Sequence, residues 1–383
     1  MDLLTEDTTA DILLRLPAAS VLRARGVCRA WRRITTDPGF LAAHARRQPP
    51  QLVLYTYLDR GDATDVAMDV LPVASGEADK RRLFRYPKGA CLLLASCDGV
   101  LLFKKGEGSY PLCNPATRQW AQLPWLAPGA PSYHDEEYAF YFHQQSGEHR
   151  LLCLRYSLRD MTGYWYILST GAGEPRHVDV HGVAVAGITN LLLMTPAAVH
   201  DHLHWLPLCQ GQASVTGGTM KILAFDMLSE MFKVMTGPPS STTTSAALIR
   251  LFTMEGLLVT ADFGKLKEMD LWFLEDYDAE RWEFRHRVAI PWQSCGYYGT
   301  PYDAERLCCG VAVGDREGNV MLGKDCIIFV YNVRSKTVRT LNSVATPKND
   351  VLVSHHVLQE SLVQHPSFSA RSSTDLGLIH FWS

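Results

Sequence analysis

The sequence lacks the usual signals of membrane insertion and secretion. Its 383 residues contain no apolar run of about 18 residues, the minimum length for a membrane-spanning helix. The N-terminus is acidic and polar, whereas a signal peptide is basic and then apolar. The formal net charge of −3 gives no general attraction to nucleic acid or to anionic membranes. We therefore expect a protein of the cytoplasm and/or nucleus that binds neither nucleic acid nor membrane.

Short catalytic and metal-binding motifs are also missing. The sequence has no G-x-S-x-G, no phosphate-binding glycine loop and no H-E-x-x-H. It has 10 cysteines, but none forms a C-x-x-C pair, and only Cys308 and Cys309 are adjacent. Cysteines scattered through apolar runs predict buried free thiols in a reducing compartment. We expect no catalytic residue, no metal site and no cofactor.

The first part of the chain, residues 1–48, has the apolar spacing of helices. Pro17 and Asp37–Pro38 are turn signals, and Ser20 is the predicted N-cap of the helix after Pro17. So short a helical segment buries little surface alone, so its apolar side must meet the rest of the chain or a partner. The segment is basic, with eight arginines against five acidic residues, but it shows no nucleic-acid recognition motif. The apolar positions are Leu4, Ile12, Leu13, Leu16, Val21, Leu22, Val27, Cys28, Trp31 and Ile34.

The second part, residues 49–383, follows a linker at 47–51 and reads as many short strands. Three stretches share a polar or acidic residue, a glycine and an apolar run, and a fourth is looser. Glycine accepts the positive φ that a tight hairpin turn needs, so each stretch predicts a hairpin. The stretches are CDGVLLF (97–103), MEGLLVT (254–260), REGNVML (316–322) and, more loosely, QSGEHRLL (145–152).

A second hairpin signal recurs through the same region. Each copy has an Asn or Asp whose side chain can bond the local backbone in a turn. An apolar anchor follows six residues later on the outgoing strand. The pairs are Asn114 with Trp120, Asp226 with Phe232, Asp276 with Trp282, and Asn332 with Val338.

The spacing of these hairpins predicts a β-propeller. The glycines at 99, 147, 256 and 318 are separated by 48, 109 and 62 residues, so one turn is missing near residue 202. With it restored the period is about 55 residues, close to that of a kelch blade. Five turns give five blades, and residues 51–90 and 345–383 together supply a sixth. The fold class is thus mainly β, a small helical domain followed by a six-bladed propeller, with five or seven blades left open.

One stretch has the residue types of a metal site. His200, Asp201, His202 and His204 lie within five positions, and alternate residues of a strand share one side. Aligned on the acid of the other hairpins, however, Asp201 occupies the acidic position and His202 the glycine position. The stretch is then the missing turn, which separates the histidines. We therefore expect His202 at the bend, no metal, and a fold that is intact or slightly more stable after His202→Gly.

Two further groups of residues could belong to binding loops. Asp135, Glu136 and Glu137 are interpreted as a solvated acidic loop. The tyrosines of SYHDEEYAFY (132–141) and CGYYGTPYD (295–303) are interpreted as either interface anchors or strand residues. The residues that would bind a target stay unassigned.

Together the two parts resemble plant F-box proteins with an F-box-associated, kelch-like β-propeller domain. The resemblance covers nearly the whole chain. In the first part it is carried by R-L-P at 15–17, V-C-x-x-W at 27–31 and D-P-x-F at 37–40. In the second part it is carried by SCDGVLLF, LCNPATRQW and VYNVRSKTV. The implied domains are an F-box at 1–48 and the associated propeller at 49–383.

The resemblance implies a non-catalytic substrate-receptor subunit of a Skp–cullin–F-box ubiquitin ligase. The F-box would bind a Skp-family adaptor, and through it the cullin, while the propeller would recruit an unknown target for ubiquitination. Thr5, Thr8 and Thr9 stand where the family usually has Pro and a Leu pair, which would weaken adaptor binding. A kelch-type propeller enzyme and an F-box scaffold outside any ligase are the alternatives. The implied adaptor contacts are Leu4, Ile12, Leu13, Leu16, Pro17, Leu22, Val27, Cys28 and Trp31, some of which must form the internal core.

Overall fold

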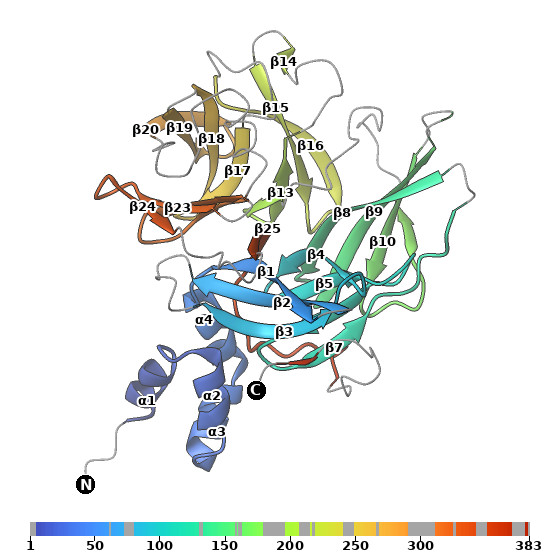
Figure 1. Cartoon of the computed structure of the whole chain (residues 1–383), viewed down its shortest axis with the longest axis vertical. Coiled ribbons are helices and arrows are strands. Elements are labelled where there is room, and N and C mark those ends of the chain that lie inside the picture. Colours follow the sequence, from blue (N-terminus) through green and yellow to red (C-terminus); the bar gives the residue numbers. More distant parts are fainter. Residues whose placement is uncertain are drawn as a thin grey trace.

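A computed structural model of the whole chain gives the architecture (Figure 1). In the residues that the structure describes, it begins with four helices and continues with β-strands. No helix in the described part of the chain has the length and apolar character that crossing a membrane requires. The described residues are 5–60, 63–72, 80–129, 133–157, 159, 163–178, 196–206, 215–216, 219–239, 249–265, 268–289, 311–324, 327–341, 351–369 and 380–381.

The helical part begins at a side-chain cap. Thr5 Oγ1 accepts a hydrogen bond from the Thr8 backbone N–H at 3.2 Å, which is the usual way to satisfy a free N–H at a helix start. Asp37 does the same for the fourth helix, with its Oδ1 2.9 Å from Phe40 N. The helices are α1 (Glu6–Leu13), α2 (Ala18–Ala24), α3 (Arg29–Thr36) and α4 (Pro38–Arg47).

The predicted cap at Ser20 is wrong. Helix α2 starts at Ala18, directly after Pro17, so Ser20 lies within its first turn. Pro17 has φ −58° and ψ 152°, which is an extended conformation, and the next residue is the first of the helix. The proline alone therefore sets the start of the helix, and no side chain caps it.

The strands form six sheets, as the repeat predicted, with the blades arranged around a ring (Figure 1). The second blade holds β4 (Leu92–Cys97), β5 (Val100–Lys104), β6 (Pro111–Asn114) and β7 (Gln119–Gln122). The third holds β8 (Tyr133–His143), β9 (Glu148–Ser157), β10 (Gly163–Ser169) and β11 (Arg176–Val178). The fourth holds β12 (Ala197–Val199), β13 (His202–Trp205), β14 (Val215–Thr216), β15 (Thr219–Asp226) and β16 (Met231–Thr236).

The remaining blades complete the ring. The fifth holds β17 (Ile249–Met254), β18 (Leu257–Lys265), β19 (Glu268–Asp276) and β20 (Arg281–Ala289). The sixth holds β21 (Val311–Gly314), β22 (Asn319–Lys324), β23 (Ile327–Asn332) and β24 (Thr337–Leu341). The first holds β1 (Gln51–Arg60), β2 (Ala63–Pro72), β3 (Arg81–Pro87), β25 (Val351–Leu358) and β26 (His380–Phe381).

The two ends of the propeller sequence close the ring in one sheet, as the leftover segments predicted. Strand β25, from the C-terminal part, pairs antiparallel with β1, for example Leu54 opposite Val353. It runs as the red strand beside the blue β1 in Figure 1. Closure between distant parts of the chain leaves no exposed gap between the first and the last blade.

Six apolar clusters hold the blades together, one at each junction between neighbours. Leu54 belongs to the cluster that joins the first and sixth blades, and Phe103 to the cluster between the first and second. Tyr138, Val259 and Met235 belong to other junctions. The alternation of inward and outward side chains along each strand lets both faces of a blade contribute to a junction.

The polar turns of the outer hairpins were also predicted correctly. Asn114 Oδ1 accepts from Ala116 N at 3.0 Å, and Asn332 Oδ1 from Ser335 N at 2.8 Å. Asp226 and Asp276 bond their own turns in the same way. The apolar anchors differ, however: Trp120 is buried, whereas Val338 is exposed.

Candidate functional site

The N-terminal helices present apolar side chains to solvent. Ile12 in α1 is 46% exposed, and Val27, between α2 and α3, is 64% exposed. Pro17 and Cys28 are exposed as well. Figure 1 shows α1, α2 and α3 projecting away from the propeller, whereas α4 lies against it. Large apolar side chains exposed on helices that stand clear of the main domain are candidates for protein binding.

The other predicted contacts are divided between core and surface. Leu13 is buried, and Leu16, Leu22 and Trp31 are half-buried against the same helical core. Leu4 lies outside the described residues. The structure therefore brings Ile12, Pro17, Val27 and Cys28 to the surface and uses Leu13 internally.

The threonines that depart from the family pattern have structural roles here. Thr5 Oγ1 caps α1 and lies 2.8 Å from Thr8 Oγ1. Thr9 is buried, and its hydroxyl donates to the Thr5 carbonyl at 3.0 Å. The hydroxyls thus satisfy backbone and side-chain groups at the start of the helix. The first helix forms without the usual Pro and Leu pair.

Helix α3 adds a basic face beside this apolar surface. Arg29, Arg32 and Arg33 are spaced three and four residues apart, so they lie on one side of the helix, and all are exposed. Arg33 pairs with Glu6 of α1 at 2.5 Å. Trp31 and Ile34, on the other side, face the helical core. The sequence showed the excess of arginine but not that three of them share one face.

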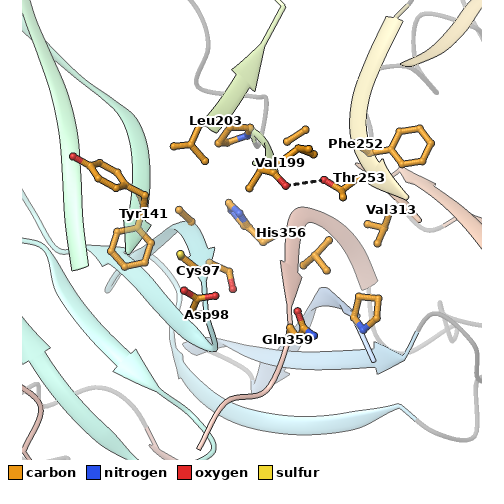
Figure 2. A pocket seen from close by; sticks show the side chains of 18 of the residues that line it. Cys97, Asp98, Tyr141, Val199, Leu203, Phe252, Thr253, Val313, His356 and Gln359 are labelled. Atoms are coloured by element: carbon orange, nitrogen blue, oxygen red, sulfur yellow. Dashed lines mark hydrogen bonds between the residues drawn. The ribbon is translucent and has the colours of Figure 1, made fainter. Parts of the chain in front are cut away.

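The propeller has a central cavity of about 1370 Å³ that is open to solvent. Its wall comes from the inner strands β4, β8, β12, β17, β21 and β25, and Arg46 and Arg47 of α4 lie at its margin. Figure 2 shows the imidazole of His356 pointing into this space between apolar side chains such as Val199 and Val313. His356 Nε2 lies 3.2 Å from the Leu93 carbonyl oxygen.

Cys97 and Asp98 lie on the same wall, at the end of β4 (Figure 2). Desolvation raises the pKa of the Asp98 carboxyl, against a smaller lowering by its hydrogen bond with Cys97. Among the described residues, no group of three His, Cys, Asp or Glu side chains is placed to hold a metal ion. The cavity wall combines apolar side chains with charged residues such as Glu255, Asp315 and Arg316.

The histidine stretch forms the predicted hairpin, but with the turn one residue earlier. The positive φ values belong to His200 (51°) and Asp201 (59°), not to His202, which begins β13. Asp201 therefore occupies the glycine position, and the alignment that put His202 there is wrong. His204 lies inside the fold, with Nδ1 3.0 Å from the Ala197 carbonyl and Nε2 2.8 Å from the Tyr277 hydroxyl.

The acidic triplet is not a solvated loop. Asp135, Glu136 and Glu137 lie in strand β8, and each has a partner. Asp135 pairs with Arg155 at 2.6 Å, and Glu137 accepts from Lys104 Nζ at 2.6 Å. Glu136 is buried and accepts from the Tyr156 hydroxyl. The missed strand signal was the aromatic-rich run that follows them, from Tyr138 to Phe142.

The predicted tyrosine anchors are also mostly structural. Tyr138 and Tyr141 are buried between blades, and only Tyr133 of that stretch is half-exposed. Residues 297, 298 and 302 lie outside the described residues. Of the cysteines described, Cys113 and Cys153 are buried free thiols as expected, but Cys28 is exposed.

Comparison with known proteins agrees with this architecture. The family model for the F-box associated beta propeller domain matches residues 76–362, and the F-box-like model matches residues 6–47. The F-box protein At3g07870 of Arabidopsis thaliana is 24% identical over 311 residues, 74% of this chain and 72% of the relative. The putative F-box protein At3g52320 of the same plant is 20% identical over 375 residues, 87% of this chain and 85% of the relative. The chain therefore belongs to the F-box-associated β-propeller family and has the domain arrangement of plant F-box proteins.

Proposed function

We propose that this chain is the substrate-receptor subunit of a Skp–cullin–F-box ubiquitin ligase. In this role residues 1–48 bind a Skp-family adaptor, which links the chain to the cullin, and residues 49–383 recruit a target protein. The chain itself is a non-catalytic subunit of the ligase complex. Its expected location is the cytoplasm and/or nucleus.

The observation that carries the proposal is the exposed apolar surface within the F-box-like region. Ile12 and Val27 are both well exposed, and α1, α2 and α3 stand clear of the propeller (Figure 1). Burial of a Val or Ile side chain in an interface contributes about 1.5–3 kcal/mol. A few such side chains at the centre of an interface are enough to dominate binding.

Affinity purification of the tagged full chain from plant cells, followed by mass spectrometry, tests the proposal. We expect a Skp-family adaptor and a cullin in stoichiometric recovery with the wild type. Recovery of the adaptor without the cullin would instead favour an F-box scaffold outside the ligase. Recovery of neither, from cells that contain both, would contradict the proposal.

The matched variants keep the fold and change only the surface. Val27→Asp places a charge on the proposed interface, and we expect it to abolish recovery of the adaptor. Val234→Asp serves as the control, because Val234 is a similarly exposed valine (56%) on β16 of the fourth blade. Equal recovery by the two variants would place the adaptor contacts elsewhere.

A further inference from the structure

The segment after β25, residues 359–369, crosses from the propeller to the helices, and we name it the C-terminal strap. Its red trace lies between the blue helices and the first blades in Figure 1. Its last residue makes an isolated bridge to β7, where the backbone N and O of Ser369 each lie 2.9 Å from Trp120. The strap thus adds no strand of its own but contacts both parts of the molecule.

The start of the strap holds the end of helix α4. Gln359 Nε2 donates to the Ala45 carbonyl at 3.0 Å and to the Gln48 carbonyl at 2.9 Å. These carbonyls belong to the last turn and cap of the helix, where the Ala45 carbonyl also accepts from the Gln48 backbone N–H at 3.2 Å. One side chain of the strap therefore bonds two carbonyls at the C-terminal end of α4.

The middle of the strap completes the apolar core of the F-box. Leu362 is 0% exposed and lies in the same cluster as Leu13, Phe40 and Leu41. Val363 packs against that cluster from the same segment. Because a segment of fewer than 50 residues buries little surface alone, an added buried leucine is a sizeable part of its core.

The strap also has hydrogen bonds, an ion pair and ring contacts on the propeller side. Asn114 Nδ2 donates to the Ser361 carbonyl at 3.0 Å, and both groups are buried. Glu360 forms an ion pair with Arg81 of β3. The rings of His365 and His149 meet edge to face, with centroids 4.5 Å apart. These contacts spread over the first three blades.

The strap contacts the propeller directly at the turn that contains Gly99. A Cβ at that position would lie 2.5 Å from Ser361 Cβ and 2.6 Å from Ser361 N, closer than such atoms approach. Gly99 also has φ +81°, a conformation that other residues rarely adopt. Only glycine at position 99 leaves room for Ser361 of the strap to pack against this turn of the second blade.

We propose that the C-terminal strap is a positioning element that completes the adaptor-binding module and sets its orientation on the propeller. The adaptor-binding module is then composite, built from residues 5–48 and from Gln359, Leu362 and Val363. A target bound to the propeller is thereby held at a fixed position relative to the adaptor. The positioning of adaptor and target rests on the proposed function. The contact by which the strap holds the helices on the propeller does not depend on it.

Hydrogen exchange on the purified full chain tests the clamp without any adaptor. We expect Gln359→Ala and Leu362→Ala each to raise the exchange rates of the α4 amides at least about tenfold, which corresponds to about 1.4 kcal/mol. The amides of β17–β20, on the far side of the ring, keep their wild-type rates. The separate variant Leu362→Met keeps the buried volume, so we expect its α4 exchange rates to be close to those of the wild type.

Gln122→Ala is the matched control, since this exposed glutamine of β7 donates only to the Leu123 carbonyl of its own blade. Wild-type α4 exchange in both Gln359→Ala and Leu362→Ala would overturn the proposal. Gln359 is exposed, so its variant folds even where Leu362→Ala does not.

Small-angle X-ray scattering and adaptor titration then separate the strap from the proposed function. We expect Leu362→Asp to lengthen the maximum particle dimension and to lower adaptor affinity at least about tenfold, with the propeller amides still protected. Unchanged scattering and unchanged affinity would overturn the positioning role. Absence of adaptor binding by the wild type would instead contradict the proposed function, whatever the exchange rates show.

Discussion

At the residue scale, the hairpin at His200 and Asp201 shows how one turn can be satisfied without glycine. Both residues have positive φ, as does the pair Asp98–Gly99 in the second blade. Asp tolerates this left-handed conformation better than most side chains do, because it bonds the local backbone. The sequence alignment placed Asp201 at the first turn position, where Asp98 stands in the second blade. In the structure Asp201 is at the second turn position, where Gly99 stands.

This placement reverses the expectation for His202. In β13 a glycine weakens the strand by roughly 0.5–1 kcal/mol, so we expect His202→Gly to lower the Tm. Asp201→Gly removes the cost of positive φ at that position and gives an equal or higher Tm than the wild type. Thermal unfolding of both variants checks this, and the opposite order of Tm values would contradict the placement of the turn.

A second residue-scale prediction concerns the buried imidazole of His204. Desolvation lowers its pKa to about 4, against 6.5 in the unfolded chain. Its Nδ1–H donates to the Ala197 carbonyl, so the neutral ring accepts from the Tyr277 hydroxyl at Nε2. Between pH 6.5 and 4 the unfolded chain binds a proton that the folded chain excludes. The free energy of unfolding therefore falls as the pH is lowered through this window, by up to about 3 kcal/mol.

Denaturant unfolding from pH 7.5 to pH 4 measures this effect. We expect His204→Gln to be less stable at pH 7.5 but to lose less stability on acidification than the wild type. His134→Gln, at an exposed position of β8, serves as the control and keeps the wild-type slope. Parallel pH profiles for wild type and His204→Gln would rule out this role for His204.

At the scale of elements, the turns at Asn114 and Asn332 followed their local signals, because each side chain bonds the backbone of its own turn. The predicted cap at Ser20 did not form, because α2 already starts at Ala18. The strap could not be predicted in this way. Gln359 donates a hydrogen bond to Ala45, which lies more than 300 residues earlier in the chain. No periodicity in residues 359–369 predicts such a contact.

The basic face of α3 gives an element-scale prediction for adaptor binding. Because Arg29, Arg32 and Arg33 are exposed beside the proposed interface, we expect them to attract an acidic surface of the adaptor. Surface ion pairs contribute about 0.2–1 kcal/mol each, so replacing all three with Gln is expected to weaken binding about 3- to 150-fold at low salt. The loss shrinks as salt screens the charges.

Titration of the adaptor at several salt concentrations measures this contribution. Arg281→Gln, on the exposed part of β20, is the control and leaves the affinity unchanged. An affinity of the triple variant equal to that of the wild type at low salt would show that the arginines are only a solvated face.

At the scale of the whole molecule, the repeat spacing was enough to predict the ring. The period of about 55 residues, with leftover segments at both ends, predicted six blades and their closure, and six sheets are present. The placement of the helices on the ring depends on contacts such as Leu362 with the F-box core, which repeat spacing does not encode. The same holds for the outward position of Ile12 and the inward position of Leu13.

Closure of the ring predicts that the blades unfold together. Leu54 is fully buried at the junction of the first and sixth blades, so Leu54→Ala is expected to cost about 2–5 kcal/mol. Leu352, in the neighbouring strand β25, is exposed, and its change to Ala stays within about 0.5 kcal/mol. Calorimetry of the propeller should show one transition, shifted to lower temperature by Leu54→Ala. A separate early transition for the first blade would contradict cooperative closure.

The most direct test of the proposed function is a titration of a purified Skp-family adaptor into the purified full chain. We predict saturable one-to-one binding by the wild type and by Val234→Asp. We predict at least about 100-fold weaker binding by the double variant Ile12→Asp/Val27→Asp, with an unchanged Tm of the propeller. Absence of binding by the wild type, or full affinity of the double variant, would contradict adaptor docking on the exposed face of the N-terminal helices.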